Sequence, residues 1–202
     1  MDEYQWFVRL YDPLLSPALR PLYREMTGLL ARRGCTTVAD LCCGTGMLAG
    51  LAARTGMDAT GVDLSPAMLG VAARKQPARF IRADAAALPL RDHVFDGATI
   101  SFALHEKPLD TALAILSEAR RIVRPGGLVV VADYRADGQG WWAGSAIRLI
   151  ERMAGRDHHA YFRRYMDKGG TDGILGSAGL PGRCERIFLG GWAGVYSLPV
   201  PG

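Results

Sequence analysis

The sequence lacks the patterns that mark several large classes of protein. It has no run of about 18 or more apolar residues, so we expect no stable insertion into a membrane. Its four cysteines form no C-x-x-C pair, which argues against a zinc site or a disulfide framework, and we expect no bound metal. Its basic residues exceed its acidic ones by only 24 to 20 and form no block of like charge, so we expect no nucleic-acid partner.

The opening stretch, MDEYQWFVRL, carries acids where a secretion signal needs a basic start, which predicts a cytoplasmic protein. The densest basic segment, residues 148–168, also contains acids, and a solvated face explains it best. Such a face is still compatible with peripheral contact with an anionic membrane. The sequence sets no expectation for the oligomeric state.

A length of 202 residues, 49% hydrophobic, suits one domain with one core, and we expect a single domain over residues 1–202. Within it, short apolar runs alternate with helical stretches. The predicted strands are Thr37–Leu41, Ala59–Asp63, Arg79–Arg82, Val94–Ser101 and Leu128–Ala132, and the predicted helices are Met47–Arg54, Pro66–Lys75 and Leu109–Val123. This alternation predicts an α/β, doubly wound, mostly parallel sheet that binds ligands at the carboxyl ends of its strands.

Two segments flank this alternating core. Residues 1–33 are predicted to be helical in two pieces, broken around the stretch YDPLLSP. The C-terminal segment is predicted to be helical in the stretch GWWAGSAIRLIERMAG, and again over His159–Asp167 and Thr171–Ala178. It should end in an antiparallel pair of strands, Glu185–Leu189 and Ala193–Leu198, which brings the expected sheet to seven strands.

The stretch VADLCCGTGMLAG indicates a ligand-binding turn between a strand and a helix. Gly44 and Gly46 let a ligand approach the backbone, and the helix that begins near Met47 presents free N–H groups. Asp63 closes the next strand about twenty residues later, where a carboxylate accepts hydrogen bonds from ribose hydroxyls. Because GTGMLA also fits G-x-G-x-x-G/A, a nicotinamide dinucleotide (NAD) remains open as the ligand at this point.

Further elements narrow the choice. Asp84, in FIRADAAALPL, follows the third strand, where its carboxylate can take the amine of adenine while the backbone of Ala85 reads the ring edge. The next stretch is HVFDGATISFALHE, a predicted strand whose end carries Ser101 and His105. It is followed by EARRIVRPGGLVVVADY, which predicts a helix, a Pro-Gly-Gly turn and another strand. From Val38 to Tyr134, the five elements in this order resemble the class I methyltransferases, which use S-adenosylmethionine (SAM). One position departs from the family, because Cys42 stands where its first glycine usually does.

The resemblance implies SAM as the cofactor and a role for each matching residue. Asp40, Cys42 and the glycine loop would hold its amino-acid part, Asp63 its ribose, and Asp84 with Ala85 its adenine. Leu64 and Met68 would lie against the adenine, and Ser101 near the sulfonium. Residues 34–135 would form the cofactor-binding core, residues 1–33 a helical lid in which Tyr11 contacts the cofactor, and residues 136–202 the acceptor-covering helices and final strands.

Methyl transfer from a sulfonium is an in-line displacement, so the main catalytic demand is alignment, together with a base where the acceptor must lose a proton. His105 is the candidate base, because histidine titrates near neutral pH and this one follows the strand that should end at the methyl group. A buried, purely structural histidine is an equal alternative. Its neighbour Glu106 would either orient it or face water.

Aromatic residues after Asp133 indicate an apolar acceptor. The candidates for covering it are Trp141, Trp142, His158, His159, Tyr161 and Phe162. The layout is similar to that of the ubiquinone and menaquinone methyltransferases, which favours a small quinone-like or lipid-like acceptor. Two other functions remain open. An NAD(P)-dependent oxidoreductase would explain the glycine spacing but not Asp84, and a non-catalytic SAM-binding protein would bind the cofactor without turnover.

Overall fold

The computed structural model describes residues 8–139, 144–145, 147, 152, 156–180 and 182–202. Within this part of the chain, seven strands form one sheet in the order β3-β2-β1-β4-β5-β7-β6. The strands are β1 (Thr37–Leu41), β2 (Asp58–Asp63), β3 (Arg79–Arg82), β4 (Phe95–Ser101), β5 (Val123–Tyr134), β6 (Arg183–Phe188) and β7 (Ala193–Pro199). The first five strands run parallel, while β7 is antiparallel to both β5 and β6. The predicted seven-stranded α/β sheet is confirmed.

The strand order places a switch point beside β1. From β1 the chain goes outward to β2 and β3, and then returns to the other side of β1 for β4 and β5. The connections that leave β1 and β4 therefore diverge, and in open α/β sheets this crevice is where ligands bind.

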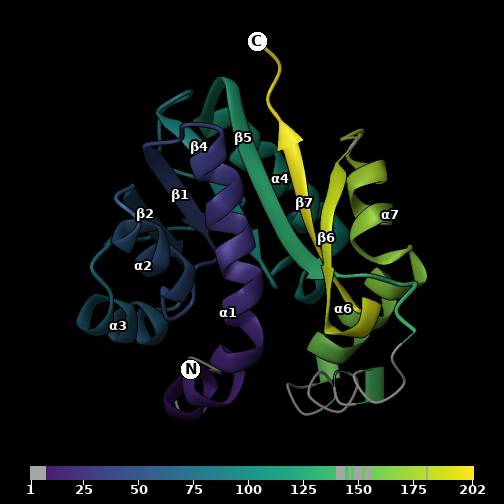
Figure 1. The fold of residues 1–202 in the computed structure, drawn as a ribbon. Helices are drawn as coiled ribbons and strands as arrows, with labels where there is room; N and C mark the ends of the chain where they lie inside the picture. Colours follow the sequence, from purple (N-terminus) through teal and green to yellow (C-terminus); the bar gives the residue numbers. More distant parts are fainter. Residues whose placement is uncertain (1–7, 140–143, 146, 148–151, 153–155, 181) are drawn as a thin grey trace.

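Helices cover both faces of the sheet (Figure 1). On one face, α1 (Val8–Arg32) and α2 (Met47–Arg54) bury leucines and methionines against Val38, Val130 and Val195. On the other face, α4 (Leu109–Ile122), α6 (Arg156–Asp167) and α7 (Gly170–Ser177) pack against Val129 and Val131. Neighbouring residues of β5 enter opposite cores because side chains alternate along a strand, and this double coverage explains why the strand is apolar from Leu128 to Ala132.

The predicted break in the N-terminal segment is wrong, because α1 runs as one helix through YDPLLSP. Prolines occupy positions 13, 17 and 21. A proline inside a helix removes one backbone hydrogen bond, but a four-residue spacing places these losses along one side of the helix. Tyr11 lies within α1, and its side chain is outside the described part of the structure.

The other boundaries follow the sequence closely. Ser65 caps α3 (Pro66–Lys75), and its side chain accepts a hydrogen bond from the Met68 amide, as predicted. Strand β5 begins at Val123 rather than Leu128, since the RPGG segment forms an irregular bulge between two ladder sections. The C-terminal helices α6 and α7 and the strand pair are confirmed. Most of the stretch GWWAGSAIRLIERMAG, with Trp141 and Trp142, lies outside the described residues.

One further finding concerns membranes. In the described part of the chain, no helix has both the length and the apolar character needed to cross a bilayer.

Candidate active site

The loop after β1 is shaped by three residues with left-handed backbone angles: Cys42 (φ 55°), Gly44 (φ 54°) and Gly46 (φ 73°). The two glycines serve different purposes. A Cβ added to Gly46 would lie 2.7 Å from the ring of Phe80, so packing requires this glycine. A Cβ added to Gly44 would have no described atom within 4 Å, so Gly44 faces open space where a ligand can approach the backbone.

Asp63, the last residue of β2, holds this loop in place. One carboxylate oxygen accepts a hydrogen bond from the Gly44 amide at 2.7 Å, and the other accepts one from the Ser65 amide at 2.9 Å. Burial raises the pKa of Asp63, and these amide donors partly offset the rise. A carboxylate has about four acceptor positions, so two remain to accept ribose hydroxyls.

Leu64, the next residue, is 60% exposed, which is unusual for a large apolar side chain in this protein. Met68, the other residue predicted to contact adenine, is buried. An apolar side chain exposed beside Asp63 and the open space over Gly44 is the arrangement that a bound adenosine would cover.

Asp40 lies beneath the loop rather than at its surface, since only 2% of it is exposed. Its carboxylate accepts hydrogen bonds from the Thr99 hydroxyl at 2.8 Å and from the Ala49 amide, in the first turn of α2, at 3.0 Å. Burial raises the pKa of Asp40 to about 7, although these donors oppose the shift. Asp40 therefore joins β1, β4 and α2 below the predicted cofactor site, and its direct contact with a cofactor stays a prediction.

The remaining predicted donor-site residues lie at the same edge of the sheet. Asp84 follows β3, is exposed, and accepts a hydrogen bond from the Ala86 amide at 2.9 Å, while Ala85 is buried. Ser101 ends β4 and is half-buried. The parallel pairing of Asp63 with Arg82 and of Leu41 with Ile100 aligns these strand ends, so the structure gathers the predicted residues along one edge.

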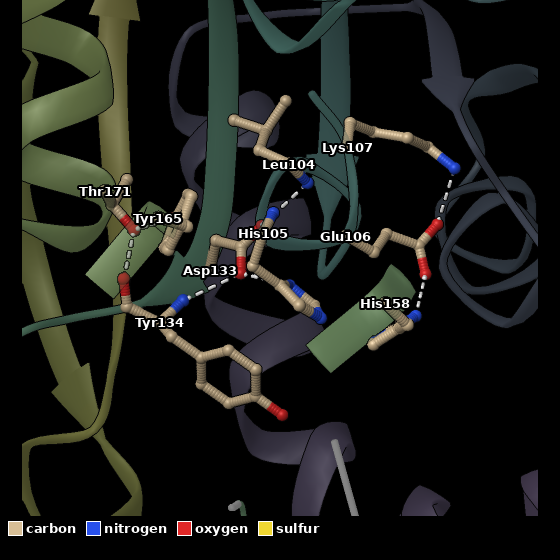
Figure 2. A network of polar contacts seen from close by, with 9 residues as sticks. All are labelled: Leu104, His105, Glu106, Lys107, Asp133, Tyr134, His158, Tyr165 and Thr171. Carbon is tan, nitrogen blue, oxygen red and sulfur yellow. Dashed lines mark hydrogen bonds and ion pairs between the residues drawn. The ribbon is translucent and has the colours of Figure 1, made fainter. Parts of the chain in front are cut away.

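His105 has a partner that the sequence did not reveal. Its Nδ1 lies 2.7 Å from a carboxylate oxygen of Asp133, near the end of β5, and both side chains are almost completely buried (Figure 2). The second carboxylate oxygen accepts the Leu104 amide at 2.9 Å. A neutral histidine that donates from Nδ1 to a carboxylate carries its lone pair on Nε2, so in this tautomer Nε2 is the nitrogen that could accept a proton.

Aromatic rings surround this pair. The ring centroid of His105 lies 4.7 Å from that of Tyr134, 6.1 Å from Phe162 and 6.2 Å from Tyr165. The Tyr165 hydroxyl hydrogen-bonds to Thr171 at 2.8 Å, and burial raises its pKa well above the ordinary value. Together with the His158 imidazole, whose centroid is 5.7 Å away, these rings surround His105 with aromatic groups, an environment that suits contact with a flat aromatic molecule.

Glu106 does not hold Nδ1 of His105, because Asp133 does. One Glu106 oxygen accepts from the Lys107 ammonium at 2.7 Å, and the other lies 3.6 Å from Nδ1 of His158 on α6 (Figure 2). Burial alone would lower the pKa of Lys107, but pairing with Glu106 raises it above its ordinary value. Lys107 therefore stays charged.

Comparisons with known proteins agree with this geometry. A family model described as "Methyltransferase domain" matches residues 38–127. Demethylmenaquinone methyltransferase from Beutenbergia cavernae is 32% identical over 198 residues, covering 90% of this chain and 81% of that relative. The enzyme of the same name from Renibacterium salmoninarum is 40% identical, but the match covers 48% of this chain and 40% of the relative.

Solved structures show the same fold at lower identity. An O-methyltransferase family protein from Burkholderia thailandensis has a TM-score of 0.71 and 19% identity, covering 96% of this chain and 60% of the other. Magnesium protoporphyrin IX methyltransferase from Synechocystis, solved with S-adenosylhomocysteine (SAH), has a TM-score of 0.62 and 18% identity, covering 90% and 83%. These two likenesses concern the fold alone.

Proposed function

Because the chain belongs to the class I SAM-dependent methyltransferases, we propose that it methylates a small, apolar aromatic acceptor, with a reduced naphthoquinone as the first choice. The observation that carries this choice is the buried His105–Asp133 pair enclosed by Tyr134, Phe162 and Tyr165. The relative from Beutenbergia cavernae supports it, since its name states that it methylates demethylmenaquinone, a lipophilic naphthoquinone. Because the chain belongs to this family, methyl transfer is proposed in place of the NAD(P)-dependent oxidoreductase and the non-catalytic SAM-binding protein.

The residues at the edge of the sheet fit an adenosyl ligand. Asp63 has acceptor positions for ribose hydroxyls, Gly44 faces open space, and exposed Leu64 gives an apolar surface for adenine. Asp84 and the backbone of Ala85 would bind the polar edge of the adenine ring. When bound, SAM supplies a methyl group on a sulfonium, whose sulfur leaves with the bonding electrons as the acceptor takes the methyl group.

In this proposal, His105 acts as the general base towards the acceptor. A reduced quinone carries hydroxyl groups, and removing the proton from one of them makes the neighbouring ring carbon nucleophilic. Nε2 of His105 would accept this proton, and Asp133 would stabilise the resulting imidazolium. In the net reaction, a ring carbon exchanges its hydrogen for a methyl group, and one proton leaves. The surrounding rings exclude water and hold the acceptor flat.

Product analysis tests the proposal. The protein would be incubated with methyl-labelled SAM and a chemically reduced demethylmenaquinone with a shortened side chain, and the product would be examined by mass spectrometry. We expect one labelled methyl on a ring carbon, and loss of this product in H105Q while SAH still binds. An aliphatic amine and NAD serve as controls. Methylation of the amine alone would refute the aromatic acceptor, and calorimetric binding of NAD without SAM would refute the donor site.

A further inference from the structure

Three side chains of α6 cover His105. His158, Phe162 and Tyr165 follow one another at spacings of four and three residues, so they lie along one side of the helix. Each presents its ring roughly edge-on to the His105 ring, with centroids 5.7, 6.1 and 6.2 Å away. Only 5% of the His105 side chain is exposed. Under the proposed function, an acceptor that reaches His105 therefore has to lie against the side chains of α6.

The ring contacts alone do not fix the position of α6 over His105. Aromatic and apolar contacts depend weakly on direction, so they permit α6 to shift along the surface that it covers. A contact between a carboxylate oxygen and an imidazole nitrogen, in contrast, involves one particular atom on each side. The contact between Glu106 and His158 joins the segment that carries His105 to the first turns of α6, on the same side of the helix as the ring contacts.

Glu106 is itself held in place by Lys107. The ammonium of Lys107 lies 2.7 Å from the Glu106 oxygen that does not face His158. The side chains of Lys107 and Glu106 are 32% and 18% exposed, so water screens their attraction only partly. The two oxygens of one carboxylate thus connect Lys107, beside the candidate base, with the helix that covers it (Figure 2).

We propose that Glu106 is a positioning residue for the acceptor: through its contact with His158 it seats α6 over His105 and sets the width of the acceptor site. This inference rests on the proposed function for its effect on catalysis, but the seating of α6 can be measured without turnover. Glu106 has no part in proton transfer in this account, and its removal should weaken acceptor binding rather than slow the chemical step.

The test compares E106Q, H158F and the double variant with the wild type. H158F keeps a ring against His105 but removes the nitrogen that faces Glu106. Using the reduced demethylmenaquinone analogue, we expect about a fivefold rise in acceptor KM in each single variant, with kcat within about twofold and unchanged SAH affinity by calorimetry. The double variant should show no larger rise than either single one, because both remove the same contact. H158Q, whose side-chain amide can donate a hydrogen bond to Glu106, should recover part of the loss.

A matched control is Glu25→Gln. Glu25 also bridges two basic groups, Arg32 on its own helix and Arg186 on β6, but it lies outside this site. Hydrogen exchange of α6 amides provides the measurement without turnover, and it should accelerate in E106Q and H158F but not in E25Q. Unchanged exchange, unchanged KM, or additive effects in the double variant would overturn the inference. Should the wild type fail to methylate the analogue, the proposed function fails, and the exchange result by itself decides whether Glu106 seats α6.

Discussion

Replacing Asp133 by Asn separates the catalytic role of the His105–Asp133 pair from its structural role. The carboxylate receives donors on both oxygens. One accepts Nδ1 of His105 at 2.7 Å and the Tyr134 amide at 2.8 Å, and the other accepts the Leu104 amide at 2.9 Å. Asparagine offers a single acceptor oxygen, so in either orientation its NH2 group faces a donor.

Two consequences follow from this geometry. Each lost hydrogen bond to a charged group costs about 1.5–3 kcal/mol, so D133N should lower the free energy of unfolding by about 2–4 kcal/mol. Without the carboxylate the imidazolium of His105 loses its counter-charge, and kcat should fall by about 10²-fold to 10⁴-fold. SAH affinity should stay unchanged, because the predicted donor residues lie on other strands.

The assay measures transfer of labelled methyl to the reduced naphthoquinone, SAH binding by calorimetry, and unfolding in denaturant. H105Q and the double variant H105Q/D133N belong in the same series. If the two residues act as one unit, the double variant is no slower than the slower single one. A D133N enzyme that is destabilised but keeps kcat within about twofold of the wild type would show that the pair is structural, and the base would have to be sought elsewhere.

Three further predictions concern the donor side. Because burial raises the pKa of Asp40 from 3.8 to about 7, the folded state favours the protonated form, and this group's stabilisation is lost as the pH rises. As the pH rises from 4 to 7, the free energy of unfolding of the wild type should therefore fall relative to that of D40N by up to about 4 kcal/mol. Denaturant unfolding at several pH values measures this difference, and parallel pH profiles of the two proteins would contradict it. C42G should leave the free energy of unfolding within about 1 kcal/mol, because relief of the left-handed backbone at Cys42 offsets the entropy of a new glycine, whereas C42V should cost about 2 kcal/mol or more; equal stability of the two variants would refute strain at this position. L64S should weaken SAH binding by about threefold to tenfold in calorimetry with little change in stability, since Leu64 is exposed before the ligand binds, and unchanged affinity would remove Leu64 from the adenine site.

Much of the fold follows from local patterns. Three of the parallel strands, β2, β4 and β5, end in Asp, Ser and Tyr, and Ser65 with Pro66 marks the start of a helix in the sequence as it does in the structure. The two C-terminal strands flank LGGW, where Gly190 and Gly191 take positive φ angles. In these places the local preferences of the chain and the packed structure agree.

The predictions from sequence differ from the structure where several residues must be considered together. Proline normally breaks a helix, and only the spacing of positions 13, 17 and 21 makes a continuous α1 tolerable. At the site, the signal for Asp133 was an acid at the end of the apolar run VVVAD, the same signal that identified Asp63. Its partner His105 is 28 residues earlier in the chain. Sequence order favoured the adjacent Glu106 for this role, and the pairing becomes visible only when β4 and β5 lie side by side.

A crystal structure with SAH bound tests the central claim most directly. We expect the ribose hydroxyls to donate to Asp63, the adenine to cover Leu64 next to Asp84, and the sulfur to lie near Ser101, on the side that faces His105 and Tyr134. An adenosyl group bound elsewhere, or protein atoms filling the space over Gly44 in that crystal, would contradict it.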